Sequence, residues 1–336
     1  MEAISATSGR PRVLVIGAGV AGLVTATVLA ERGATVCLVH RPDPATRASH
    51  VAGGMLAPWC EAADASPALL APGVEAIGWW AHHVPATCRR GSLVVAARRD
   101  QGELARFSRR TTGHRMCSAD EVAALEPDLA GRFAQALFFA EEAHLDPRAA
   151  LRALAVGLVQ RGVEMQEQDA AEVEPADFGH VIDCRGHAAA PMLPDLRGVR
   201  GEMLLLRCAG VALRRPVRLL HPRIPLYIVP RGEGVFMVGA TMIESADRRA
   251  VTARSAVELL NAAYALHPAF AEAEILEAGS NIRPAFPDNM PALRRQGHVL
   301  HLNGMYRHGF LLSPSLARRA AAIVFGEDTI ETGEAA

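Results

Sequence analysis

The sequence predicts an α/β fold with two interleaved parts, one built on a parallel sheet and the other, an α+β part, on an antiparallel sheet. A short apolar run at residues 13–16 is followed by a glycine-rich turn, an apolar helical stretch and a second apolar run at 34–39. This order is typical of a βαβ unit in a parallel sheet. Between residues 199 and 243 the pattern changes to short strand-like runs separated by turns, which indicates antiparallel strands.

Local signals place the other elements along the 336 residues. The first helix occupies residues 20–32 and ends at Gly33; a later helix is capped by Asp146, begins at Pro147 and stops before Gly162. Further helices are expected at 68–83, 119–125, 253–266 and 314–325, and strands at 92–97, 181–186, 203–207, 227–229, 235–240 and 298–303. Residues 326–336 predict an acidic, frayed tail.

Composition argues against several partners. Half of the residues are hydrophobic, the formal net charge is −1 and the sequence pI is about 6.9, so neither nucleic acid nor an anionic membrane is expected as a partner. No apolar run reaches the roughly 18–20 residues that span a bilayer. The first twelve residues are polar and lack the apolar centre of a signal peptide, so we expect a mature, cytoplasmic protein.

The cysteine and lysine content excludes further chemistry. The six cysteines lie far apart and form no CxxC pair, so neither a zinc site nor a disulfide framework is predicted, and the dispersed histidines lack the spacing of metal ligands. All 35 Lys+Arg residues are arginine. The absence of lysine rules out a P-loop lysine and a Schiff-base lysine, and with it pyridoxal phosphate chemistry.

The glycine-rich turn at residues 17–22 predicts a dinucleotide site. Gly17 permits a sharp turn, Gly19 lets a pyrophosphate approach the backbone, and Gly22 lets the helix pack close to the strand. Val20 and Ala21 open the helix, whose N-terminus attracts the anion. The alternative is an ordinary tight turn between strand and helix.

The second strand departs from the usual dinucleotide pattern, because His40 and Arg41 stand where an acidic residue would hold the ribose. A basic pair suits a ribose 2′-phosphate, which would indicate NADP. Alternatively, His40 donates to a ribose oxygen, Asp43 substitutes for the acidic residue, or the pair is simply a polar strand end. The sequence leaves these alternatives open.

Five segments together resemble a known family: GAGVAGL after the first strand, SHVAGGMLAP at 49–58, VPRGEGVFMVGATMIE at 229–244, NIRPAFPDNMP at 281–291 and GMYRHGFLLSPSLA at 304–317. In this order they resemble the FAD-dependent amine oxidases of the D-amino acid oxidase type, and among these most the glycine oxidases of thiamine biosynthesis. The resemblance covers residues 13–325. It implies a discontinuous Rossmann-like FAD-binding domain at 1–85, 140–198 and 270–326, a substrate domain at 86–139 and 199–269, and a tail at 327–336.

The resemblance also implies residue roles. Arg283 and Tyr227 match the pair that holds the substrate carboxylate, Met242 matches a residue that lines the substrate pocket, and Arg307 matches an arginine bordering the active site. The residues expected to contact FAD, including the loop beside the flavin ring and the turn around its pyrimidine end, are Gly17, Gly19, Val20, Ala21, Gly22, His40, Arg41, Gly53, Gly54, Met55, Leu56, Tyr306, His308, Gly309, Phe310, Leu311 and Leu312.

The residue types agree with these roles. The guanidinium of Arg283 offers a fork of donors that matches a carboxylate, and the proline after it favours an extended backbone. The alternatives are a surface arginine, a sheet-packing tyrosine at position 227 and a plain core methionine at 242. A last helix beginning at Ser313 and Pro314, together with Arg307 and His308, would place positive potential beside a reduced flavin, and Gly309 would let the backbone approach its ring. The alternative is an exposed strand-to-helix turn.

We therefore expect oxidative deamination of glycine, extending to sarcosine or small D-amino acids, to the imine with hydrogen peroxide from dioxygen. No side-chain base is required, since positioning does most of the work. The open alternatives are a D-amino acid oxidase or dehydrogenase for larger substrates, an NADP-dependent dehydrogenase and a non-catalytic flavin-binding protein. A sarcosine-type oxidase is disfavoured, because that branch commonly uses a lysine above the flavin. A thiazole synthase is the expected partner; the oligomeric state is left open.

Overall fold

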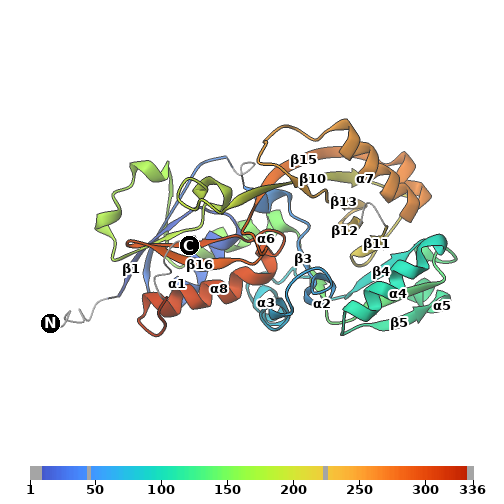
Figure 1. Ribbon diagram of the computed structural model, residues 1–336, viewed down its shortest axis with the longest axis horizontal. Coiled ribbons are helices and arrows are strands. Elements are labelled where there is room, and N and C mark those ends of the chain that lie inside the picture. Colours follow the sequence, from blue (N-terminus) through green and yellow to red (C-terminus); the bar gives the residue numbers. More distant parts are fainter. Residues whose placement is uncertain (1–9, 44–46, 222–225, 331–336) are drawn as a thin grey trace.

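The computed structural model describes residues 10–43, 47–221 and 226–330. The molecule is elongated, with a parallel sheet and its helices at one end and a larger, mainly antiparallel sheet at the other (Figure 1). This arrangement confirms the predicted α/β fold class. No helix within the described ranges is long and apolar enough to cross a bilayer.

The first sheet has six strands, all parallel except the edge strand β16. In spatial order they are β16 (Ala292–Gln296), β17 (Val299–Asn303), β9 (His180–Asp183), β1 (Arg12–Ile16), β2 (Thr35–His40) and β8 (Glu164–Glu167). The helices that pack around this sheet are α1 (Val20–Glu31), α3 (Leu70–His83), α6 (Pro147–Gln160) and α8 (Gly309–Val324). Helix α1 is buried along ten consecutive residues because α6 and α8 both pack against it, which explains why its sequence is apolar on every side.

The second sheet has nine strands. Its main path runs β14 (Ile243–Glu244), β10 (Arg197–Arg207), β13 (Val235–Gly239), β12 (Leu226–Gly232), β11 (Val217–Leu220), β4 (Ser92–Ala96), β6 (Gln135–Phe139) and β5 (Arg115–Ser118), while β15 (Glu274–Ala285) pairs with β10. The pairing is antiparallel except between β11 and β4. Helices α4 (Gln101–Arg110), α5 (Ala119–Leu125) and α7 (Ala253–Leu266) accompany this sheet, and short elements β3 (Met55–Leu56), α2 (Pro58–Glu61) and β7 (Ala143–His144) lie between the two ends.

Strand β15 is the main element that the sequence did not predict. It pairs with β10 along almost its whole length, with Val199 opposite Arg283 and Gly201 opposite Asn281. Because this strand contains polar residues, its sequence does not show the apolar pattern that predicts a strand. The sequence predicted only an extended backbone at Arg283. The pairing attaches residues 274–285 to the antiparallel sheet, whereas the sequence grouped them with the FAD-binding domain. The domain boundaries stay a prediction.

The last helix begins at Gly309, so the prediction of a start at Pro314 was wrong. Pro314 lies inside α8, where it has no N–H for the carbonyl of Phe310. The indole Nε1–H of Trp80 donates to that carbonyl over 2.6 Å and takes the place of the missing bond. A proline that would normally mark a helix start is therefore accommodated one turn inside the helix.

The expected frayed tail was also wrong for its first residues. Glu327 forms an ion pair with Arg32, and Asp328 accepts from Arg319 at 3.1 Å. Ile330 packs against the core around α1 and α8. The six residues that follow lie outside the described part of the chain.

Candidate functional site

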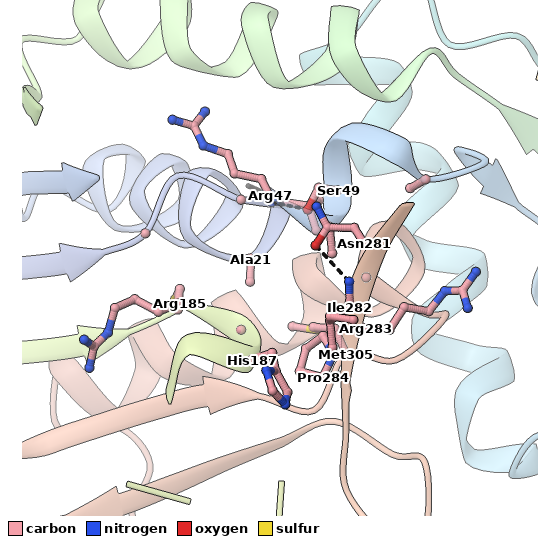
Figure 2. A pocket seen from close by; sticks show the side chains of 18 of the residues that line it. Ala21, Arg47, Ser49, Arg185, His187, Asn281, Ile282, Arg283, Pro284 and Met305 are labelled. Atoms are coloured by element: carbon pink, nitrogen blue, oxygen red, sulfur yellow. Dashed lines mark hydrogen bonds between the residues drawn. The ribbon is translucent and has the colours of Figure 1, made fainter. Parts of the chain in front are cut away.

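A long cavity connects the two sheets. It begins at the glycine-rich turn after β1 and the end of β2, passes the segment before β3, and reaches β12, β15 and the start of α8. Figure 2 shows Arg47 and Arg185 among its lining residues, with Ile282, Arg283 and Pro284 of β15 also facing it. A small recess adjoins it, lined by Arg218, Tyr227, Ala240, Met242, Arg283 and Arg307. Cavity and recess share three residues, so they form one continuous site.

The glycine-rich turn has the close contacts that its sequence predicts. Gly17 has φ +106°, and a Cβ on Gly22 would lie 1.7 Å from the carbonyl oxygen of Gly17, so no side chain fits at position 22. Gly19 is the N-cap of α1 and has no capping side chain; instead the Val20 N–H donates to Ser49 Oγ at 3.0 Å. The N-terminus of α1 thus opens onto the cavity, as an anion site requires.

The end of β2 is basic and internally bonded. Arg47 donates to the carbonyl of Arg41 over 3.2 Å and lies 3.1 Å from His40 Nδ1, while Arg41 pairs with Asp169 at 2.9 Å. His40 Nδ1 also lies 2.8 Å from the carbonyl oxygen of Arg41, which can only accept, so Nδ1 donates there when it is protonated and accepts from Arg47 when it is not. Arg41 already has a carboxylate partner, so its guanidinium is less available to bind a ribose phosphate.

The end of β9 supplies a second charged pair that sequence reasoning missed. Asp183 is almost fully buried and accepts from Arg185 through both carboxylate oxygens, at 3.0 and 2.8 Å. Burial alone would raise the pKa of Asp183, but His301 and Arg185 outweigh it and hold that pKa at about 2. The ionised Asp183 fixes Arg185 at the cavity wall. The sequence Asp-Cys-Arg-Gly at the end of a predicted strand could have indicated this charged pair.

The segment before β3 is held by an arginine from the other sheet. Arg231 of β12 donates to the carbonyls of Ala52, Gly53 and Leu145 at 3.2, 2.8 and 3.1 Å. Burial lowers the pKa of Arg231 to about 10, so it stays charged at neutral pH. The ring of Tyr227 packs directly on Gly53, where a Cβ would approach it to 2.7 Å. The loop is therefore fixed against β12.

Arg283 projects from β15 into the junction of cavity and recess. Its guanidinium packs on the backbone of Gly201, where a Cβ would lie 2.3 Å away, and its Nη1 donates to the Thr241 carbonyl at 2.9 Å. No described carboxylate forms an ion pair with it. Burial lowers the pKa of Arg283 from its usual value. A partly buried cation without a carboxylate partner favours an anionic ligand.

Glu61 lies at the other side of the recess and was also missed from the sequence. Its Oε1 is 3.1 Å from Arg307 and 3.8 Å from Arg218, and its Oε2 is 3.7 Å from His308. Burial opposes its ionisation, but these cations hold the pKa of Glu61 below its usual value, while Glu61 raises the pKa of Arg307. Nothing in the local sequence PWCE distinguishes Glu61 from a surface residue.

Helix α8 starts at the cavity. His308 is its N-cap and is almost fully buried; burial lowers the pKa of His308 despite the nearby Glu61. Tyr306 adopts φ +44°, and its hydroxyl lies 3.5 Å from Met242 Sδ, as Arg307 Nη1 does at 3.6 Å. The helix N-terminus thus opens onto the site at Gly309, five residues before the expected position.

Most of the predicted site residues line this site. The cavity brings together Gly17, Gly19, Val20, Ala21, His40, Arg41, Gly53, Gly54, Met55, Tyr227, Arg283, Tyr306, Arg307, His308, Gly309, Phe310 and Leu311. Met242 lines only the recess and is 48% exposed, so it is no core methionine. Gly22, Leu56 and Leu312 do not line the cavity: Gly22 packs against Gly17, and the two leucines belong to apolar clusters.

A family model described as "DAO: FAD dependent oxidoreductase" matches residues 12–323. The chain belongs to this family of FAD-dependent oxidoreductases. A provisionally named thiamine biosynthesis oxidoreductase ThiO of Rhizobium etli is 55% identical to this FAD-dependent oxidoreductase over 92% of the chain and 95% of the relative. A glycine oxidase of Pseudomonas aeruginosa is 28% identical over 95% and 96%.

Solved structures agree on the fold. The crystal structure of glycine oxidase from Geobacillus kaustophilus has a TM-score of 0.80 at 22% identity and covers 95% of this chain and 96% of that one. Iminodiacetate oxidase from Chelativorans sp. BNC1 also has a TM-score of 0.80, at 25% identity, over 94% and 96%. These comparisons confirm the predicted resemblance and FAD as the cofactor. They therefore argue against the alternative of an NADP-dependent dehydrogenase.

The cavity residues of this FAD-dependent oxidoreductase fit the cofactor. The turn at Gly17 and Gly19 leaves open backbone at the N-terminus of α1, where a pyrophosphate would bind. Arg47 and Arg185 add positive charge, and the start of α8 offers a second helix N-terminus. Among the described residues no group of three or more His, Cys, Asp or Glu side chains could hold a metal ion.

Proposed function

We propose that this FAD-dependent oxidoreductase oxidises glycine, with sarcosine and small D-amino acids as further substrates, to the imine. The observation that carries the proposal is the unpaired guanidinium of Arg283 beside Tyr227 in the recess. The other recess arginines, Arg218 and Arg307, each have a carboxylate partner. A substrate carboxylate would supply the counterion that Arg283 lacks, and its fork geometry suits two parallel hydrogen bonds.

The size of the recess supports a small substrate. Its volume is about 20 Å³, against about 300 Å³ for the main cavity. Tyr227 closes one side, where its ring packs on Gly53, and Met242 closes another, where its sulfur contacts Tyr306 and Arg307. A hydrogen or methyl group on the α-carbon fits such a recess, whereas a large side chain would have to displace Met242.

The recess residues also support a mechanism that requires no side-chain base. None of the six residues that line it is a carboxylate or a histidine, so its described walls offer neither of the commonest general bases for taking a proton from the α-carbon. When bound, FAD would accept the two electrons released as the amine becomes an imine and pass them to dioxygen. We assign Arg283 and Tyr227 to hold the carboxylate and Arg307 with Met242 to border the substrate.

The names of two relatives support a role in thiamine biosynthesis. Besides the Rhizobium etli protein, a bifunctional protein ThiO/ThiG of Nostoc is 27% identical over 93% of this chain and 52% of that longer protein. We infer that the imine from glycine serves a thiazole synthase.

An anaerobic spectrum tests the proposal. The FAD-loaded protein is mixed without oxygen with glycine, sarcosine, D-alanine or D-phenylalanine, and flavin bleaching is followed; peroxide is measured after air is admitted. Bleaching by glycine at the lowest concentration supports the proposal. Faster bleaching by D-phenylalanine would support the D-amino acid oxidase alternative, and no bleaching by any amino acid would support a non-catalytic flavin protein.

A further inference from the structure

The recess gathers three guanidinium groups from three separate segments. Arg218 comes from β11, Arg283 from β15 and Arg307 from the turn before α8. The side chain of Arg218 is 5% exposed and that of Arg307 is 17% exposed, so solvent screens neither charge strongly. Such a concentration of positive charge would by itself attract ligands that carry two negative groups.

Two carboxylates limit this charge. Glu61 bonds Arg307 at 3.1 Å and lies 3.8 Å from Arg218, and its side chain is only 13% exposed. Asp64 bonds Arg218 at 3.1 Å, but it is 44% exposed and also pairs with Arg110 at 3.3 Å. Glu61 is therefore the stronger restraint on the recess, and together the two leave Arg283 as the cation without a carboxylate partner among the described residues of the recess.

Among the described residues that line the cavity, Glu61 is also the one acidic side chain at the recess end. Of the described residues that line the main cavity, only Glu61 and Asp169 are acidic, and Asp169 belongs to the opposite end, where it pairs with Arg41. None of the recess residues is acidic. A second acidic group on a substrate would approach Arg307 and would there meet the charge of Glu61.

We propose that Glu61 determines specificity: it occupies Arg307 and repels a second acidic group, so that the site accepts amines with one carboxylate and rejects those with two. The inference rests on the proposed function, because it takes Arg283 as the substrate carboxylate site. Glu61 acts through Arg307 and is a positioning residue. Removing its charge leaves Arg307 free to bind a second carboxylate.

Ligand binding without turnover tests this role. Acetate and malonate are titrated into the FAD-loaded protein, and perturbation of the flavin spectrum gives their affinities. Glu61→Gln is expected to raise malonate affinity relative to acetate roughly tenfold or more, since a repelling charge is lost and a binding cation is released. The ratio of kcat/KM for D-aspartate to that for glycine should rise in parallel. An unchanged malonate-to-acetate ratio in a variant with full FAD content overturns the inference.

Further variants distinguish an effect of the Glu61 charge from a structural effect of its substitution. Glu61→Asp keeps the charge and should keep the wild-type ratio; a shift as large as that of Glu61→Gln would refute a charge effect. Glu75→Gln, on the exposed face of α3 where Glu75 pairs with Arg318, should change nothing, and a shift there would also count against the inference. If Glu61→Gln does not retain FAD, Asp64→Asn should give a smaller shift in the same direction, and no shift would overturn the inference. Because acetate and malonate need no turnover, failure of glycine to bleach the flavin challenges the proposed function alone.

Discussion

Replacing Arg283 with alanine tests the substrate site most directly. The guanidinium lies against Gly201 with no intervening space, and one of its nitrogens is already used by the Thr241 carbonyl. The remaining donors face the recess, where two charge-assisted hydrogen bonds to a carboxylate would contribute about 3–6 kcal/mol together. Since each 1.36 kcal/mol is a factor of ten, Arg283→Ala should lower kcat/KM for glycine by roughly 10²–10⁴.

Arg283→Lys refines this expectation. Lysine keeps the positive charge but not the planar fork, so the loss should be intermediate, about 10–100-fold. Both variants should keep stoichiometric FAD, because Arg283 lies where the cavity meets the recess and is not part of the glycine-rich turn that would hold the pyrophosphate. The assay is anaerobic stopped-flow reduction of the flavin as a function of glycine concentration, with FAD content measured from the absorption spectrum.

The matched control is Arg207→Ala. Arg207 lies on β10, the strand that pairs with β15, but its side chain is 54% exposed and its ion pair with Glu274 is at the surface. This variant removes the same charge and should keep wild-type kinetics. If Arg283→Ala with full FAD content retained kcat/KM within threefold of wild type, the assignment of Arg283 to the substrate carboxylate would be refuted.

Three further predictions concern two other residues of the site and a buried glutamate outside it. Met242→Phe should change the relative rates of glycine and D-alanine at least severalfold, because Met242 lines the recess; equal relative rates would exclude it from the pocket. Gly22→Ala should greatly reduce FAD retention, since its Cβ would meet the Gly17 carbonyl at 1.7 Å; a fully yellow, stable variant would contradict this. Burial raises the pKa of Glu142 to about 7, so its contribution to stability is full below its unfolded pKa near 4.3 and falls by about 3–4 kcal/mol as the pH rises from there through 7. Glu142→Gln, which can keep a hydrogen bond to Ser92, should flatten the pH dependence of chemical denaturation between pH 5 and 8; an unchanged profile would refute the buried ionisation.

The βαβ unit and several helices could be predicted because their signals are local. The helix at 119–125 and the helix at 253–266 have the expected bounds, and both have side-chain N-caps, Ser118 and Thr252. The start of the last helix could not be found locally. Pro314 looks like a helix start, and only the indole of Trp80, more than 200 residues earlier, explains why the helix continues through it.

Most of the predicted site residues come from the segments that carry the family resemblance. Glu61 and Arg218 lie outside these segments, and Arg231 lies within one but has no local signature. Glu61, Arg218 and Arg231 act through distant partners: Glu61 meets Arg307, and Arg231 meets carbonyls of the loop at Ala52 and Gly53. Their roles depend on the pairing of β11 and β12 within the large sheet, which the sequence did not specify. Pattern reasoning finds a residue that has a local signature, but it does not find one whose function depends on a tertiary contact.

The arginines of the site differ in whether they have a carboxylate partner, and this difference indicates where an anionic ligand would bind. At the end nearest the glycine-rich turn, Arg41 and Arg185 each hold a carboxylate, and the N-terminus of α1 provides the main attraction for an anion. In the recess, Glu61 occupies Arg307 in the same way, whereas Arg283 has a single carbonyl partner. A partly buried guanidinium without a carboxylate partner is stabilised when an anionic ligand binds beside it. The arginine without a carboxylate partner therefore lies at the small recess, and this coincidence supports the proposal of a small amino acid as the substrate.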